Sequence, residues 1–380
     1  MKKLSKTTKS NFITYAIVIL AFVICQSLAE FGPFNIFGAE IKMTRSLKGQ
    51  LVPICVYIVM AVSLNLTVGI SGELSLGHAG FMSVGAFSGI VASGWMLSAL
   101  HLENETVRLI LSMIVGGACA GVAGVLIGIP VLRLRGDYLA IVTLAFGEII
   151  RNVMNCLYIS LIPGSVIYVA DAVNPDIFTK SNALDKLHIA FNSTPDPSWN
   201  VLVNGPMGAT GVDKISTFVM GFVLVMFALI VVLNLINSRS GRAIMAIRDN
   251  RIAAESMGVN ATQYKMMAFV TSAVLAGMAG ALYGLNYSTV AASKFKFDTS
   301  ILVLVFVVLG GIGNMRGSII AATLLTILPE MLRAFADYRM LVYAIVLILV
   351  MLATNNPQVR QLIDRIIPKR KASKKEGETA

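Results

Sequence analysis

A glycine-rich stretch in the first quarter of the chain, Ser71–Gly80, contains polar side chains suited to chemistry, those of Glu73, Ser75 and His78. The stretch joins two apolar runs and, with Gly77, interrupts their helical periodicity. A charged side chain at bilayer depth costs roughly 2.5–3.5 kcal/mol on insertion scales, so Glu73 needs a partner or a water-filled route. Irregular backbone at that depth is tolerated only where protein buries it or where it lines an aqueous path. His78 alone also fits a hydrogen-bonded histidine of the core.

A second glycine-rich break, Gly310–Gly317, occupies a loosely corresponding place in the later half of the chain. Paired discontinuities of this kind predict a substrate route at mid-membrane, where N–H groups at the starts of half-helices can meet a carboxylate. The residues expected along this route are Glu73, Ser75, Gly77, His78, Gly310, Gly311 and Gly313. The alternative is close helix packing through glycine, with Glu73 near the inner surface as a cap.

The polar stretch 238–265 carries the second candidate set. Asp249 or Asn250 suits a helix N-cap and Gly258 suits a C-terminal stop, which predicts a short surface helix parallel to the membrane. Small side chains leave a shallow face that suits docking into a groove on a soluble partner. The alternative is an ordinary inner loop, since basic residues are common in the inner loops of membrane proteins. The residues assigned to this docking are Gly241, Arg242, Arg248, Asp249, Ala253, Ala254, Glu255 and Gly258.

The elements that position these residues are apolar helices. The chain has 380 residues, of which 56% are hydrophobic and 13% charged, and its mean hydropathy is +0.77, which excludes a soluble globule. A membrane crossing needs roughly 20 apolar residues in helix. We therefore expect an all-α polytopic bundle of about 8–10 spans, some of them broken. The full runs are Phe12–Ala29, Leu51–Ile70, Ala79–Leu100, Leu109–Leu132, Tyr138–Ile162, Thr217–Asn237, Met266–Ala292 and Met340–Thr354, with Ile301–Ile312 and Ser318–Leu332 shorter.

The distribution of positive charge predicts the orientation. With the N-terminus inside, 19 of the 31 lysines and arginines lie on the inner side and 11 on the outer side, which by the positive-inside rule places both termini in the cytoplasm. The expected regions are an N-terminal segment, 1–11, a transmembrane domain, 12–354, an outer loop, 161–215, and a basic tail, 355–380. The net charge of +11 thus indicates a lipid bilayer as partner and no nucleic acid, with the tail either on anionic headgroups or simply solvated.

Other features point away from catalysis. Glu148 and Arg151 are three residues apart within one run and are expected to neutralise each other. The four cysteines lie in apolar runs without metal-ligand spacing, and the chain contains no phosphate-binding loop or zinc signature. We therefore expect neither an enzyme, nor a metal site, nor a cofactor. The outer stretch 161–203 either meets a solute-delivering partner or is a tolerated insertion.

The run Ala253–Gly258 resembles the signature of ABC importer permeases, in which two alanines are followed, after three intervening residues, by a glycine, although Ile252 stands where the signature has glutamate. The longer stretch Gly241–Lys265 is similar to the LivM-type branched-chain amino-acid permeases. Further stretches that are similar to the same family are Gly72–Phe81, Arg135–Leu144, Ala268–Ala273, Ala276–Tyr283 and Gly310–Gly317.

This resemblance implies a permease subunit of a branched-chain amino-acid importer in the cytoplasmic membrane. Its implied partners are a second, LivH-type permease, two cytoplasmic ATPase subunits and an extracytoplasmic binding protein. Gly241–Gly258 would be the element that sits on an ATPase subunit. Urea or another small amide or amino acid stays open as substrate, and so does an ion-coupled secondary transporter that works alone.

Overall fold

The computed structural model describes residues 6–30, 34–36, 39–41, 45–134, 136–162, 166–171 and 200–332, with 341, 344, 345 and 348. The chain divides into two compact units, Met1–Ile327 and Leu328–Ala380, and the helices and strands below lie in the first apart from the end of α12. Most of the predicted span Met340–Thr354, most of the outer loop and the whole tail 355–380 lie outside the described residues.

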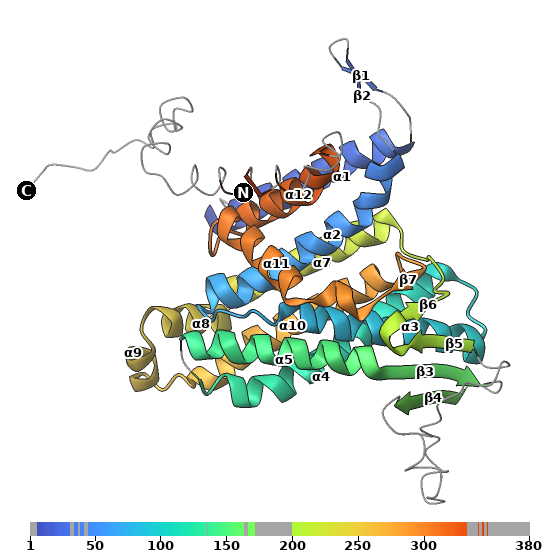
Figure 1. Ribbon diagram of the computed structural model, residues 1–380. Coiled ribbons are helices and arrows are strands. Elements are labelled where there is room, and N and C mark those ends of the chain that lie inside the picture. The colour runs from blue at the N-terminus through green and yellow to red at the C-terminus, as the bar shows by residue number, and fades with distance from the viewer. Residues whose placement is uncertain are drawn as a thin grey trace, which may run out of the picture. The chain divides into compact units, whose positions relative to one another are not determined.

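Helices form most of the described chain (Figure 1). They are α1 (Lys6–Glu30), α2 (Arg45–Asn65), the π-helix η1 (Leu66–Ile70), α3 (His78–Leu100), α4 (Glu105–Val131), α5 (Asp137–Cys156), η2 (Gly205–Met207), α7 (Phe218–Asn237), α8 (Arg239–Asp249), α9 (Arg251–Ser256), α10 (Ala261–Gly284), η3 (Ala292–Phe295), α11 (Phe297–Gly310) and α12 (Met315–Met331). The strands are β1 (Phe34–Ile36), β2 (Ala39–Ile41), β3 (Leu157–Ile162), β4 (Val166–Asp171), β5 (Asn200–Asn204), β6 (Ala209–Thr210) and β7 (Thr289–Val290).

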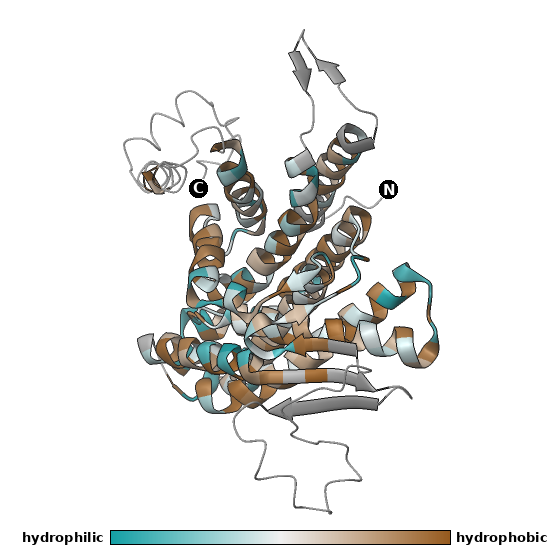
Figure 2. Ribbon diagram, turned by 45° about the vertical axis from the view of Figure 1, so that its right-hand side comes forward, coloured by the Kyte–Doolittle hydropathy of each residue, from teal (hydrophilic) through white to brown (hydrophobic). Residues whose placement is uncertain are grey.

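Six helical segments among the described residues are long and apolar enough to cross a membrane: α2 with η1, α3, α4, α5, α7 and α10. Shorter apolar helices are Thr14–Ser27 within α1 and Phe297–Gly310, which is α11. Figure 2 shows that these helices are hydrophobic over most of their length. The predicted all-α polytopic bundle is thus confirmed.

Glycine contacts hold the centre of the bundle together. Helix α10 packs most extensively against α3 and α4. A Cβ added to Gly85 of α3 would overlap the carbonyl oxygen of Gly277 in α10, and one added to Gly280 would overlap the carbonyl oxygen of Met82. Lipid tails are themselves apolar, so the hydrophobic effect does not drive helices together within a bilayer. Close backbone packing of this kind is therefore a main source of helix association in membranes.

The outer helices expose many large apolar side chains. On α5, Ile141, Ile149 and Val153 are all more than half exposed, and on α4 the same holds for Ile114 and Leu126. By contrast, 94% of the most apolar stretch within Ser46–Ile70, which comprises α2 and η1, is buried inside the bundle. Exposed hydrocarbon on this scale is expected where lipid rather than water surrounds the helices.

A five-stranded antiparallel sheet, with strand order β4-β3-β5-β6-β7, forms at the end of the bundle opposite α8 and α9 (Figure 1). Two predicted spans are wrong in extent for this reason. The run Tyr138–Ile162 is helical only to Cys156, and its last six residues form β3. The run Met266–Ala292 ends as a helix at Gly284, after which β7 and η3 follow.

Candidate functional site

The α8–α9 segment, residues 238–260, links the long helices α7 and α10. The Ser238 hydroxyl caps α8 by accepting a hydrogen bond from the Gly241 N–H at 3.1 Å. Gly241 is buried, and a Cβ there would overlap the carbonyl oxygen of Leu235, so the turn from α7 into α8 requires glycine. Arg242 donates from Nη1 to the carbonyl oxygen of Asn237 at 3.2 Å, which satisfies one of the last carbonyls of α7.

Helix α9 begins and ends at the predicted residues. The Asn250 side chain accepts a hydrogen bond from the Ala253 N–H at 3.1 Å, which confirms the N-cap prediction for Asn250. Gly258 adopts a φ of +82°, the left-handed conformation that ends helices at glycine. The short surface helix that the pattern predicts is α9, and a second helix that the pattern does not predict, α8, precedes it. The chain leaves helical geometry between the two at Asn250, with φ −154° and ψ 101°.

The two faces of α9 differ. Ala254 is buried and joins Ile247 of α8 and Ala261 of α10 in a small apolar cluster. On the outer side, the side chains of Ile252 and Met257 are 81% and 84% exposed. Ala253 is also exposed. The two apolar side chains therefore project from a segment that is otherwise rich in charge.

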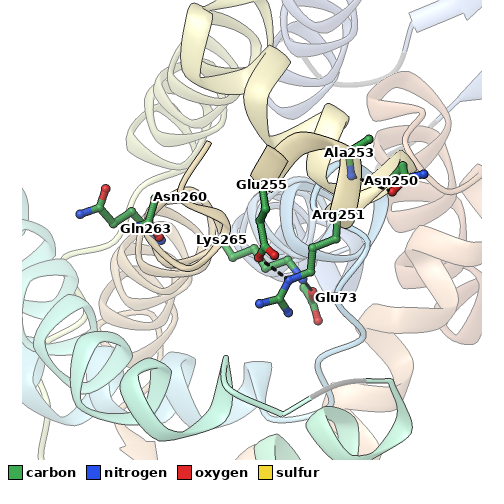
Figure 3. A network of polar contacts seen from close by, with 8 residues as sticks. All are labelled: Glu73, Asn250, Arg251, Ala253, Glu255, Asn260, Gln263 and Lys265. Carbon is green, nitrogen blue, oxygen red and sulfur yellow. Dashed lines mark hydrogen bonds and ion pairs between the residues drawn. The ribbon is translucent and has the colours of Figure 1, made fainter. Parts of the chain in front are cut away.

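Charged side chains surround a cleft of about 620 Å³ beneath α9. Arg251 Nε donates to Glu255 Oε1 at 2.7 Å, one turn along α9, and Lys265 of α10 forms an ion pair with Glu73. Figure 3 shows the side chains of Arg251 and Glu255 extending toward Glu73 and Lys265. The cleft thus brings Glu255, from the α8–α9 set, next to Glu73, from the expected substrate route.

The first glycine-rich stretch, Ser71–Gly80, is held by hydrogen bonds to three helices. The Leu76 N–H donates to Thr143 Oγ1 of α5, and the Ala79 N–H at the start of α3 donates to Ser300 Oγ of α11, both at 3.0 Å. His78 Nε2 shares a 2.8 Å hydrogen bond with Ser63 Oγ of α2. This contact agrees with the hydrogen-bonded core histidine considered above.

Two further members of this break differ in their surroundings. Gly77 packs so closely on α5 that a Cβ would overlap the Thr143 carbonyl oxygen. The hydroxyl of Ser75 is buried without a hydrogen-bond partner among the described residues. A buried hydroxyl without a partner loses free energy unless water or another polar group reaches it.

The second break contacts the helix that precedes the first. Gly311 and Gly313 have φ values of +92° and +81°, and the Gly313 N–H donates to Asn65 Oδ1 at 2.8 Å. Gly310 and Gly317 approach so closely that a Cβ on either would overlap the other's backbone. The structure therefore brings Gly313 against α2 and η1, but no described contact joins Gly310, Gly311 or Gly313 to His78.

Sequence reasoning missed the role of Asn65 and one contact of Glu148. Asn65 is fully buried and also donates from Nδ2 to Ser318 Oγ at 2.8 Å, so it joins α2 to α12. Glu148 pairs with Arg151 at 2.7 Å, as expected, and in addition accepts a hydrogen bond from the Phe297 N–H at the start of α11. A lone amide within an apolar run is a usable signal for Asn65, since polar groups in membrane helices need partners.

Comparison with known proteins identifies proteins that are similar to this chain over much of its length. A family model described as the permease component of branched-chain amino acid transport systems matches residues 47–351. The high-affinity branched-chain amino acid transport system permease protein LivM of Salmonella typhimurium is 34% identical over 304 residues, which cover 78% of this chain and 66% of that protein. LivM of Escherichia coli shows the same identity and coverage, so the chain spans slightly less than two thirds of the length of these relatives. The LivH permease protein of Escherichia coli is 32% identical over 117 residues, 30% of this chain and 38% of LivH. No solved structure matches the chain significantly.

Proposed function

Because the chain belongs to the family of permease components of branched-chain amino acid transport systems, we propose that it is the membrane-spanning permease subunit of an ABC importer for leucine, isoleucine and valine. The observation that carries this proposal is the α8–α9 segment. It lies between two membrane-crossing helices, and exposes Ile252 and Met257 among charged groups. An exposed apolar pair on a short, capped helix suits insertion into a groove on a soluble protein.

The proposed assembly contains a second permease of the LivH type, two cytoplasmic ATP-binding subunits and an extracytoplasmic binding protein. Similarity to both LivM and LivH supports the pairing of two related permeases. Four arginines on α8 and α9 support placing this segment, with both chain termini, on the cytoplasmic side of the membrane. The ATPase-coupling residues proposed on it are Gly241, Arg242, Arg248, Asp249, Ala253, Ala254, Glu255 and Gly258, of which Gly241 and Ala254 are buried and set the shape of the segment.

Transport then proceeds by alternating access. ATP binding and hydrolysis in the partner subunits displace α8 and α9, which rocks the bundle and opens the route inward. A ligand shifts a conformational equilibrium only through unequal affinity for the two states, so the ATPase must bind α9 with a different affinity in each state. Along the proposed route, the Ser75 hydroxyl, which has no hydrogen-bond partner in the described part of the chain, is available to water or to a polar substrate group. Both glycine-rich breaks border this route.

Uptake into proteoliposomes tests the function. The chain is reconstituted with its permease partner, and radiolabelled leucine uptake is measured with and without the ATPase subunits, the binding protein and ATP. We expect uptake only when all are present. Uptake driven by an ion gradient alone overturns the proposal in favour of a secondary transporter. Competition by unlabelled isoleucine and valine, but not by urea, identifies the substrate class.

Substitution on α9 tests the docking segment. Gly258→Glu and Ala254→Glu introduce a bulky acid at the C-terminus of α9 and in its buried face, respectively. Both variants should enter the membrane but lose uptake and substrate-stimulated ATP hydrolysis. Gly211→Glu is the matched control, since Gly211 also has a positive φ, +69°, and open space around it, but lies at the opposite end of the bundle. Unimpaired uptake by both α9 variants counts against docking there.

A further inference from the structure

Arg248 connects the last turn of α8 to the π-helix η1, 179 residues earlier in the chain. Its Nη1 donates to the carbonyl oxygen of Gly69 at 2.9 Å, while Nε and Nη2 donate to Asp249 Oδ1 at 3.0 and 2.9 Å. A guanidinium presents several donors in a fixed plane, so the bond to Asp249 sets the direction in which the remaining nitrogen points. The Arg248 guanidinium is therefore held by the Asp249 carboxylate on α8 and by the Gly69 carbonyl oxygen on η1.

The Gly69 carbonyl is available because helical geometry ends there. The carbonyl oxygens of Leu66 and Thr67 accept from Ser71 and Glu73, as the wider turns of this segment require. The last carbonyls of a helix have no donor within it and carry partial negative charge, which a cation stabilises. Arg248 supplies that cation. Its side chain also packs against Gly72, which has a φ of +76°, so closely that a Cβ added to Gly72 would lie only 2.6 Å from Arg248 Cγ.

The other side of Gly69 touches the second glycine-rich break. A Cβ on Gly69 would overlap both Asn65 Oδ1 and the backbone nitrogen of Gly313. Asn65 binds that nitrogen at 2.8 Å and binds Ser318 of α12 at 2.8 Å. Gly69 is thus enclosed by α8 on one side and by the 310–317 break on the other, without space for independent movement.

We infer that Arg248 is the positioning residue that transmits displacement of α8 to both glycine-rich breaks through Gly69. This inference rests on the proposed function, in which a partner ATPase moves α8 and α9. Since Gly69 has no room on its Gly313 side, a shift of the Arg248 end carries the backbone of residues 69–72 with it. The same backbone continues into the first break, and its contact with Asn65 and Gly313 reaches the second. Closely packed elements transmit small displacements because they are not freely deformable.

The test separates docking from transmission. Arg248→Ala removes the bond to Gly69, Arg248→Lys keeps a cation and one donor, and Arg239→Ala removes the same charge from the exposed first residue of α8. In the reconstituted complex, leucine taken up per ATP hydrolysed is the readout, together with recovery of the ATPase subunits after purification. We expect Arg248→Ala to retain the ATPase yet lose about tenfold in leucine per ATP, within the usual range of coupling between sites. Arg248→Lys should restore most of it and Arg239→Ala should match the wild type.

A second readout follows the backbone itself. Nucleotide binding should change amide hydrogen exchange at residues 71–77 in the wild type and in Arg239→Ala, but not in Arg248→Ala. If Arg248→Ala transports with wild-type stoichiometry and keeps the nucleotide-dependent exchange, the transmission role is overturned. If Arg248→Ala fails to assemble, Arg248→Gln, which removes the positive charge, takes its place in both measurements. An Arg248→Lys variant that is as uncoupled as Arg248→Gln then overturns the transmission role. Absence of ATP-driven uptake in the wild type would instead overturn the proposed function.

Discussion

Glu73 and Lys265 form an ion pair between residues 192 positions apart in the chain, with only 12% and 13% of their side chains exposed. The pair gives Glu73 the partner that a carboxylate in a membrane protein requires. It also places Glu73 against the second turn of α10, directly after α9. Glu73 therefore lies next to the α8–α9 segment, whereas His78, five residues later, contacts Ser63 within the bundle.

Removing one partner of this pair should destabilise the fold more than removing both. Glu73→Gln or Lys265→Met leaves one poorly hydrated charge unpaired, and we expect a loss of about 2–3 kcal/mol in the free energy of unfolding for each. The double variant removes both charges and should recover more than half of the summed loss. Denaturant titration in detergent micelles measures all three. Strictly additive losses would show that the two charges do not interact.

Replacing Asn65 should lower the free energy of unfolding by more than replacing its partner Ser318. Asn65→Leu keeps the branched shape of the side chain but removes the partners of the Gly313 N–H and the Ser318 hydroxyl, so the free energy of unfolding should fall by about 2–4 kcal/mol. Ser318→Ala removes only one of these bonds and should cost about 1 kcal/mol. The comparison is made by denaturant titration of the purified variants. Equal losses for both would contradict a structural role of the Gly313 bond.

Local signals in the sequence predict local structure well here. Asn250 and Gly258 define the ends of α9, because capping and positive φ depend on neighbouring backbone alone. The Glu148–Arg151 pair is likewise visible as an i, i+3 spacing. The contact of Arg248 with Gly69 is not visible in the same way, since its partner is a backbone carbonyl 179 residues away and any residue type supplies one.

The sheet shows a second limit. Residues 157–162 read Leu-Tyr-Ile-Ser-Leu-Ile and continue the apolar run of α5, so length alone assigns them to the helix. Their high content of β-branched and aromatic residues favours a strand, and this signal separates β3 from α5. Pairing with β5, across a stretch of the chain outside the described residues, decides the outcome.

Close glycine packing predicts a sharp difference between two alanine substitutions. Gly85→Ala places a methyl group on the Gly277 carbonyl oxygen, and because both atoms belong to backbones of packed helices we expect a loss above about 3 kcal/mol. Gly49 lies near the start of α2, with nothing within 4 Å of an added Cβ. Gly49→Ala should therefore stabilise by about 0.5–1 kcal/mol through helix propensity. Thermal denaturation of the two variants checks the opposite signs, and a mild effect of Gly85→Ala would mean that α3 and α10 can separate.

The N-cap of α9 links local helix stability to the proposed docking. Asn250→Ala removes the acceptor of the Ala253 N–H and should cost about 1 kcal/mol of local stability, whereas Asn250→Asp keeps an acceptor at the same place. Amide hydrogen exchange across residues 251–256 should accelerate about fivefold in the alanine variant, as expected for such a loss, and stay near the wild-type rate in the aspartate variant. Because Ile252 and Met257 are presented by this helix, recovery of the ATPase subunits should fall in parallel with its protection. If the alanine variant loses protection but binds the ATPase as tightly as before, then an ordered α9 is not what the partner recognises.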